Sequence, residues 1–328
     1  MRSRPTATAH DPGDLINAMP AMFGFPPQDS LVGLGLDGKR ICFGMRLDLS
    51  DVADVETAAD YVVRHLQNQV VGSGIDGAII IAIGQPLELG RELVLAVESR
   101  LFAGRCDGLL LTVDPVAGGW ATDDRYWISM DGGDPNGYPY QRSLAHPITL
   151  QGIAAGQEIV GSRAELEARF EPIWGVKRRW LDSTSAQIAA RRDATADAEL
   201  AAVVLPVVHD LYATRPVGDG PVLELAYAMT RIAVRDSAWA LITPANARDM
   251  VRVWVHVARW APADWAPPAL SLAAFAAWLT GDGACAVTAA QRALSIDPEY
   301  SMGGLMLRLA TSGIAPDAWH QVAGRVRD

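Results

Sequence analysis

Residues 26–49, PPQDSLVGLGLDGKRICFGMRLDL, decide how the first part of this chain folds. Two apolar runs flank Asp37-Gly38, a dipeptide that type I′ hairpin turns favour because both central residues of such a turn need a positive φ. A tight turn at that point places Leu34 opposite Ile41 on an apolar face. The stretch therefore predicts an antiparallel β-hairpin around which the N-terminal domain is built.

The opposite face of this predicted hairpin carries glycines and ends in polar side chains. The same register places Asp29 opposite Arg46, and the alternation of side chains along a strand puts Asp48 on the face of Arg46. We therefore expect a cross-strand ion pair between Asp29 and Arg46. With Ser30, these residues form the candidate binding site: Asp29, Ser30, Arg46 and Asp48. The cluster either fixes the hairpin or binds a small polar ligand.

The segments after the hairpin alternate between helix and strand patterns. Apolar residues recur at helical spacing over residues 50–71 and 87–102, and continuous apolar runs at 78–83 and 109–113 are typical of buried strands. A strand, a helix and a strand in this order predict a parallel pair. Because the hairpin joins the same sheet, the sheet is expected to be mixed. Residues 118–129 suggest a second hairpin at one edge, and residues 131–147 a loop.

From residue 162 onward the patterns are helical. Ser162 and Glu165 have the spacing of a capping box. Thr243-Pro244 is expected to cap a helix that begins at Pro244. The helices that we expect to follow the capping box cover residues 174–192, 196–214, 221–234, 236–242, 244–260, 267–280, 283–296, 299–311 and 316–325. The fold class predicted is an α/β domain with a mixed sheet at residues 1–160, followed by an all-α domain at 161–328.

The last clear helices resemble a tetratricopeptide repeat. Ala274, Ala286, Ala293 and Pro298 match the small-residue and proline spacing of one such repeat. Because a single repeat cannot bury its apolar face alone, we expect a repeat-like hairpin within a helical bundle.

Composition limits the classes of function. The net charge is −10, and residues 1–160 hold 11 basic against 20 acidic residues, a net charge of −9. An acidic domain repels nucleic-acid phosphate, so nucleic acid is not expected as a partner. No apolar run approaches the ~18 residues of a membrane helix. Three cysteines, an odd number, fit a reducing compartment. We expect a soluble, cytoplasmic protein that does not bind membranes.

Sequence motifs for known chemistry are incomplete in this chain. Gly33-x-Gly35-x-x-Gly38 has the letters of a dinucleotide fingerprint but lies in a strand and its turn, where the fingerprint must open a helix. The segment 131–137 lacks the ligand spacing of a calcium loop. Cysteines and histidines are too scattered for a tetrahedral site, so we predict no transition metal and no cofactor. Basic residues cluster at 177–179 and 191–192, which we interpret as solvated helix faces.

Three segments carry a family resemblance. They are residues 20–34 (PAMFGFPPQDSLVGL), 45–49 (MRLDL) and 271–300 (SLAAFAAWLTGDGACAVTAAQRALSIDPEY). With these segments the chain resembles the DUF4192 domain family of uncharacterised actinobacterial proteins over most of its length. The resemblance implies no activity, and it assigns no role to any residue.

Two functional hypotheses follow from the sequence. The first is a cytoplasmic binding or protein-interaction protein without catalysis of its own, because catalytic motifs are incomplete and repeat-like helices are commonly used for partners. The alternative is a hydrolase-type enzyme with its site near Asp29, Arg46 and Asp48. The partner is accordingly expected to be a protein or a small polar ligand.

Overall fold

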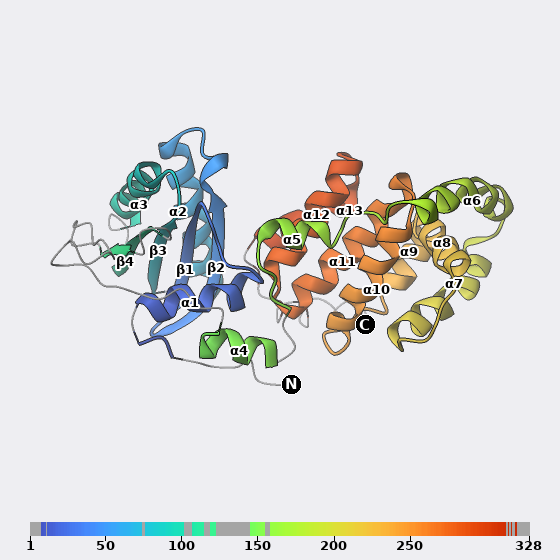
Figure 1. Ribbon diagram of the computed structural model, residues 1–328, viewed down its shortest axis with the longest axis horizontal. Coiled ribbons are helices and arrows are strands. Elements are labelled where there is room, and N and C mark those ends of the chain that lie inside the picture. The colour runs from blue at the N-terminus through green and yellow to red at the C-terminus, as the bar shows by residue number, and fades with distance from the viewer. Residues whose placement is uncertain are drawn as a thin grey trace. The chain divides into compact units, whose positions relative to one another are not determined.

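The chain forms two compact units, Met1–Arg163 and Ala164–Asp328. Figure 1 shows the computed structural model, with the chain coloured from its N-terminus to its C-terminus. The structure describes residues 8–10, 12–73, 76–101, 107–114, 119–122, 145–154, 158–312, 314, 316 and 319. The sequence-based boundary at residue 160 lies close to the division between the two units.

The first unit is built on a five-stranded mixed sheet with the strand order β2-β1-β3-β4-β5. Strand β1 pairs antiparallel with β2 and with β3, β3 pairs parallel with β4, and β4 pairs antiparallel with β5. The mixed sheet and the parallel pair are therefore confirmed. The strands are β1 (Ser30–Asp37), β2 (Arg40–Asp48), β3 (Gly77–Ile83), β4 (Asp107–Asp114) and β5 (Gly119–Thr122).

The hairpin β1–β2 exists, but its register differs from the prediction. Asp37 pairs with Arg40, so the two turn residues are Gly38 and Lys39. Leu36 lies opposite Ile41, and Leu34 lies opposite Gly44. The predicted pairing of Leu34 with Ile41, and the face assignment that followed from it, are therefore wrong.

Two features of the turn and of β2 account for the different register. Gly38 has a φ of 58° and supplies a positive φ in the turn without the steric cost that Asp37 would incur. The Gly38 N–H donates to the Asp76 carboxylate at 2.8 Å, and the Asp76 N–H donates to the Leu36 carbonyl at 2.8 Å. The pairing then shifts between Gly35 and Leu36, leaving Cys42 as an extra residue in β2. A carboxylate 38 positions away thus holds the turn.

Both faces of the sheet are covered by helices. On one face, Val32, Leu34 and Ile81 pack with residues of α1 (Pro12–Phe23). On the other face, Leu31 and Ile80 pack with residues of α2 (Val55–Ser73) and α3 (Leu87–Leu101). A short 3-10 helix, η1 (Leu49–Asp51), follows β2.

Large side chains of β2 occupy the space beside the glycines of β1. A Cβ atom at Gly33 would lie 3.0 Å from Cγ of Met45, the residue that pairs with it. Phe43, Met45 and Leu47 pack on the core formed by α2 and α3. The glycine-bearing face is therefore part of a packed core, and the polar residues Arg46 and Asp48 lie on the opposite face, with Val32 and α1.

The first unit is completed by a segment that returns to α1. Helix α4 (Pro147–Ala154) contacts α1. The buried Thr149 hydroxyl donates to the Asn17 carbonyl at 2.9 Å, and His146 Nε2 lies 2.9 Å from Asp14 Oδ1. Pro20 lies inside α1, and the helix continues past it to Phe23.

The described part of the second unit is helical, as expected. Helix α5 begins at Arg163, the last residue of the first unit, and runs into the second. The helices are α5 (Arg163–Ala168), α6 (Val176–Arg192), α7 (Asp197–Tyr212), α8 (Asp219–Ala228), α9 (Ile232–Trp239), α10 (Ala247–Trp260), η3 (Ala263–Trp265), α11 (Ala266–Thr280), α12 (Gly283–Ile296) and α13 (Ser301–Thr311).

Two predicted helix boundaries in this unit are wrong. The predicted helix over residues 221–234 is interrupted between α8 and α9. Helix α10 begins at Ala247 and not at Pro244. There the Asn246 side chain accepts from the Thr243 N–H at 2.7 Å and donates to the Leu241 carbonyl at 2.8 Å. The amide thus stabilises a turn ahead of the helix, a role that the Thr-Pro pattern does not reveal.

Helix α11 forms the core of the second unit. Residues 266–279 are all buried, and α11 contacts α10, α12 and α13. Ala286 and Ala293 of α12 are fully buried, and α12 ends before Pro298. The resemblance of α11–α13 to a tetratricopeptide repeat stays a prediction.

Several predictions fall outside the described residues. These are the second strand of the edge hairpin at residues 125–129, the loop and calcium-like segment up to residue 144, Cys106, and most of the last helix at 316–325. Among the helices that are described, none combines the length and hydropathy needed to cross a membrane.

Candidate functional site

The polar cluster lies where the ends of three strands meet. Ser30, at the start of β1, pairs with Asp48 at the end of β2 and with Ile83 at the end of β3. The carboxyl end of β4 lies at the same edge, because Ile83 pairs with Val113 in a parallel ladder. In open α/β sheets, ligands bind outside the carboxyl ends of the strands. The edge is therefore the position at which a ligand site of this fold is expected.

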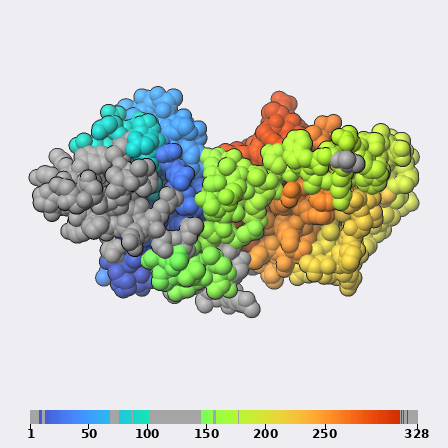
Figure 2. Space-filling model, viewed as in Figure 1, coloured from blue at the N-terminus to red at the C-terminus, as the bar shows by residue number. Residues whose placement is uncertain are grey.

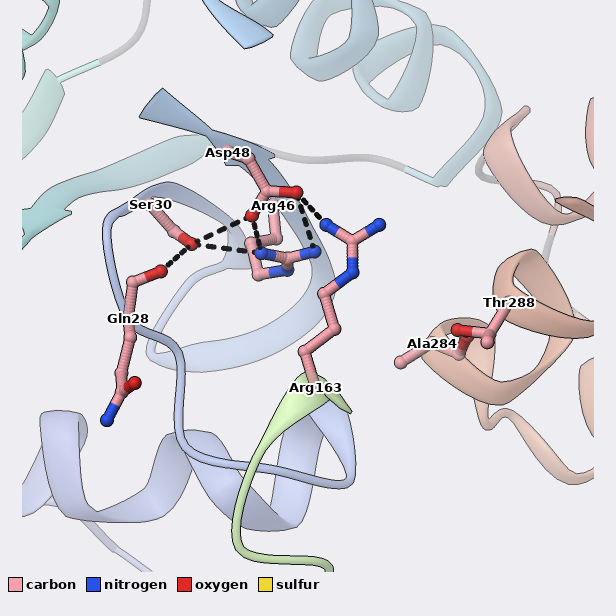
Figure 3. A network of polar contacts seen from close by, with 7 residues as sticks. All are labelled: Gln28, Ser30, Arg46, Asp48, Arg163, Ala284 and Thr288. Atoms are coloured by element: carbon pink, nitrogen blue, oxygen red, sulfur yellow. Dashed lines mark hydrogen bonds and ion pairs between the residues drawn. The ribbon is translucent and has the colours of Figure 1, made fainter. Parts of the chain in front are cut away.

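Three of the four predicted site residues contact one another (Figure 3). Arg46 forms a two-armed ion pair with Asp48, through Nη1 to Oδ1 and through Nη2 to Oδ2 at 3.4 Å. Arg46 Nη1 also donates to the Ser30 hydroxyl at 2.9 Å. The Ser30 hydroxyl proton has its nearer acceptor in the Gln28 carbonyl, at 2.6 Å, while Asp48 Oδ1 lies at 3.4 Å.

Two residues of the cluster were not predicted. Arg163 donates through Nη1 to Asp48 Oδ2, so Asp48 receives two guanidinium groups. Phe25 places its ring 5.3 Å from the guanidinium carbon of Arg46, within the range of a cation–π contact. Arg163 is 115 positions from Asp48, and no local pattern signals that contact. Phe25 lies in the segment 20–34 that carries the family resemblance, and in the sequence only its aromatic character points to a role.

The fourth predicted residue, Asp29, takes a different position. The register places Val32, and not Asp29, opposite Arg46, so the predicted cross-strand opposition is wrong. Asp29 Oδ1 accepts from the Gln85 N–H at 2.7 Å, in the connection between β3 and α3. Its φ is 45°, and its carbonyl accepts from the Leu49 N–H at 2.8 Å. Asp29 therefore ties three strand ends together through its backbone and its carboxylate.

The chemistry of the cluster is set by burial. The side chains of Arg46 and Asp48 are 16% and 15% exposed, and Ser30 is fully buried. A serine nucleophile needs a base that takes its proton, whereas the nearest acceptor for Ser30 is a peptide carbonyl. Two guanidinium groups around one carboxylate favour an anion over a cation at this edge. The arrangement suits structural fixation and, at the partly exposed Arg163, contact with an anionic group.

A second feature is an exposed aromatic and basic surface at the start of α6. We call it the α6 edge and define it as Trp174, Lys177, Arg179 and Trp180. Trp174 is 77% exposed, the largest fraction of any large apolar side chain among the described residues, and Trp180 is 43% exposed. Lys177 and Trp180 are three positions apart and lie on one helix face. The α6 segment is visible at the surface of the helical unit in Figure 2.

Part of the basic cluster at 177–179 is engaged by the protein itself. Arg178 pairs with Asp182 and donates to the Ala261 carbonyl at 2.8 Å. Lys177 Nζ lies 3.0 Å from Asp219 Oδ1 and 4.7 Å from the centre of the Trp260 ring. The interpretation as a solvated helix face therefore fails for Arg178, whose side chain is 14% exposed. Lys177 remains 46% exposed.

Metal-binding chemistry has no candidate group in the part of the chain that is described. There, no three side chains of His, Cys, Asp or Glu come together as ligands would. Cys42 and Cys285 are free thiols, and burial raises the pKa of the Cys42 thiol, which favours the unreactive protonated form. The expectation of no transition metal and no cofactor stays a prediction.

Comparison with known proteins gives one relationship. Neither a search of curated proteins nor a search of solved structures finds a match to this chain. A family model described as a domain of unknown function, DUF4192, matches residues 12–317, which include the sheet, the polar cluster and the described helices up to α13. The chain therefore belongs to the DUF4192 family.

Proposed function

We propose that this protein is a binding protein that contacts a protein partner through the α6 edge, without catalysis of its own. The observation that carries the proposal is the exposure of two tryptophans six positions apart in the chain, Trp174 just before α6 at 77% and Trp180 in α6 at 43%. A tryptophan side chain presents roughly 150–250 Å² that folding usually removes from water. Tryptophan and arginine are also the residues enriched where protein interfaces have their strongest contacts.

The surroundings of the two tryptophans support an interface more than a packing defect. Helix α6 is anchored by the buried Leu181 and Ile188, so its outward face is presented by a fixed element. Lys177 is held by Asp219 and by the ring of Trp260, which orders this part of the edge before any partner arrives. A preformed surface binds with a smaller loss of conformational entropy.

We further infer that the protein acts in the cytoplasm of an actinobacterium. The support is the pair of free thiols at Cys42 and Cys285, which fits a reducing compartment, and a basic composition that is almost entirely arginine, as in GC-rich genomes.

Site-specific photo-crosslinking tests the proposed function. The crosslinker p-benzoylphenylalanine would replace Trp174 in the full chain, expressed in the cells from which the gene comes. The matched control carries it in place of Ile232, which is 67% exposed and also lies in the helical unit. We expect a discrete crosslinked protein from position 174 and not from position 232. Equal crosslinking from both positions, or none from 174, would contradict the proposal.

The alternative proposal is a hydrolase-type enzyme at the polar cluster. Its support is the position of Ser30 and Asp48 at the edge where α/β enzymes place their ligands. The burial of Arg46 and the carbonyl partner of Ser30 favour the binding protein. Substitution of Arg46 separates the two and is considered at the residue scale below.

A further inference from the structure

We infer that the partner presents an acidic segment with large apolar side chains to the α6 edge. This inference rests on the proposed function and adds the chemistry of the partner. It depends on how charge is distributed at the start of α6 and on which of the charges the protein neutralises itself.

The start of α6 concentrates positive charge. Lys177, Arg178 and Arg179 follow one another in the first turn, which contains no acidic residue. The N-terminus of a helix already carries a partial positive charge, so cations are usually placed at the other end and carboxylates at this one. The helix begins after Gly175, whose φ of 89° favours glycine and which offers no side chain for capping. Helix stability therefore does not explain the three cations.

Internal contacts account for two of these three cations. Arg178 is bound by Asp182 and by the Ala261 carbonyl, at the end of α10. Lys177 shares Asp219 with Trp260, whose Nε1 donates to Oδ1 of the same carboxylate at 3.0 Å. For Arg179, the structure shows no side-chain partner among the described residues, and the side chain is exposed. Positive charge at the edge is thus left for an external anion.

The two tryptophans define what accompanies that anion. Trp174 precedes the helix and Trp180 lies in its second turn, so Lys177 and Arg179 lie between them in the chain. A partner that brings only carboxylates leaves the exposed indole rings in water. A segment that combines carboxylates with apolar side chains pairs with Arg179 and also covers the rings.

Nucleic acid also combines anions with flat apolar groups, but the charges of the chain disfavour it. Binding a phosphate backbone requires a row of cations along the strand. At the α6 edge, Asp182 and Asp219 lie beside the cations and interrupt such a row. A short acidic peptide needs only this limited positive surface, because it has no long row of phosphates to neutralise.

Fluorescence anisotropy with defined probes tests the inference on the full-length protein. The probes are a labelled short peptide of alternating glutamate and leucine, the same peptide with lysine in place of glutamate, and a labelled single-stranded DNA oligonucleotide. We expect the acidic peptide to bind most tightly, and its affinity to fall with added salt because exposed charges are screened.

Charge-reversal and truncation variants locate the binding. We expect Arg179→Glu to weaken the acidic peptide about tenfold or more, equivalent to about 1.4 kcal/mol, and Trp174→Ser to weaken it as well. The matched controls are Arg248→Glu, an exposed arginine of α10 with no partner among the described residues, and Ile232→Ser. Both controls should retain the affinity of the original protein. Circular dichroism would check that each variant is folded.

The outcomes separate the inference from the proposed function. The inference of an acidic partner is wrong if the acidic peptide does not bind, or if the lysine peptide or the DNA binds more tightly. It is also wrong if Arg248→Glu loses as much affinity as Arg179→Glu. If crosslinking at position 174 still identifies a discrete protein, the proposed function stands and only the partner chemistry is wrong. If both experiments fail, the α6 edge is not an interface.

Discussion

The Asp48 carboxylate forms ion pairs with two arginines, and these ion pairs fix the end of β2. Arg46 reaches it from the same strand, while Arg163 comes from the end of the unit. Removing one partner of a buried ion pair costs roughly 3–5 kcal/mol, and an exposed pair contributes about 0–1 kcal/mol. Because Arg46 is 16% exposed and Arg163 remains on Asp48, we expect an intermediate cost.

The first prediction concerns Arg46→Ala. Its free energy of unfolding should fall by about 2 kcal/mol, between the exposed and buried limits. Urea titration of the variant beside the original protein measures this loss. Arg40→Ala, on the same strand but exposed and without a partner among the described residues, should lose much less. A loss in Arg46→Ala no larger than in Arg40→Ala would favour a ligand site at the cluster.

Gly84 supports the second prediction. A Cβ atom there would lie 2.3 Å from Asp29 Oδ1 and 2.6 Å from the Asp29 nitrogen, and the φ of Gly84 is 91°. Gly84→Ala must therefore displace the backbone of Asp29 and its bond to Gln85. We expect destabilisation by more than about 2 kcal/mol, measured by thermal unfolding.

Gly220→Ala is the matched control for that substitution. Gly220 lies in α8, no atom lies within 4 Å of its added Cβ, and its φ is not positive. Alanine is favoured over glycine in a helix by up to about 1 kcal/mol, so this variant should be as stable as the original or more so. Equal losses at both positions would show that the contact with Asp29 is not what excludes a side chain at Gly84.

At the scale of elements, α6, α8 and α10 are joined through one histidine-bearing aromatic cluster. The His256 ring lies 4.4 Å from the ring of Trp260, which Lys177 and Asp219 also contact. Burial lowers the pKa of the His256 imidazole, and the nearby Asp219 carboxylate only partly opposes this. His256 is therefore protonated less readily in the folded protein than in the unfolded chain.

The third prediction is the pH dependence that follows. Above the unfolded pKa of about 6.5, His256 is neutral in both states and has no effect. As the pH falls below that value, only the unfolded chain is protonated, so stability decreases until the folded pKa is passed. We expect His256→Phe, which keeps a ring against Trp260, to lose less unfolding free energy between about pH 7 and pH 5. An unchanged pH profile would contradict this origin of the loss.

The sequence predicts the elements better than their alignment. Alternating apolar residues around Asp37-Gly38 are enough to predict the hairpin, because strand periodicity and turn chemistry are local. Its register depends on Asp76, which holds the turn, and on the extra residue Cys42. The alternation of side chains along a strand predicts that Arg46 and Asp48 lie on one face of β2. The structure shows an ion pair between them. Arg163 was not predictable, because a contact over 115 positions depends on the whole fold.

At the scale of the molecule, the first unit is closed by its own last segment. Thr149 bonds to Asn17 and His146 to Asp14, which attaches α4 to α1. The Val160 N–H then donates to the Gly24 carbonyl at 2.8 Å, and Arg163 reaches Asp48. The segment 145–163 thus contacts α1, the connection after it, and the end of β2, all of which come from the start of the chain.

The last prediction compares two fragments that differ only in this segment. Residues 1–163 contain every one of these contacts and the cores on both faces of the sheet, so this fragment should unfold cooperatively by itself. Residues 1–144 keep the five strands but lose α4. The Asp14 carboxylate then lacks His146, whose hydrogen bond, after that of the His10 N–H, holds the pKa of Asp14 below its usual value.

We expect the shorter fragment to melt at a lower temperature or to remain partly unfolded. The shorter fragment loses several hydrogen bonds, each of which contributes about 1 kcal/mol, and exposes surface of α1 to water. Together these losses are a large part of the free energy of unfolding of a small domain. Thermal circular dichroism of both fragments is the measurement. Fragment 164–328 serves as the control, because its core on α11 is internal to the second unit and should form without residues 1–163. Equal melting temperatures for 1–144 and 1–163 would show that the returning segment is an appendage, and that the sheet with its helices α1, α2 and α3 is sufficient for the fold.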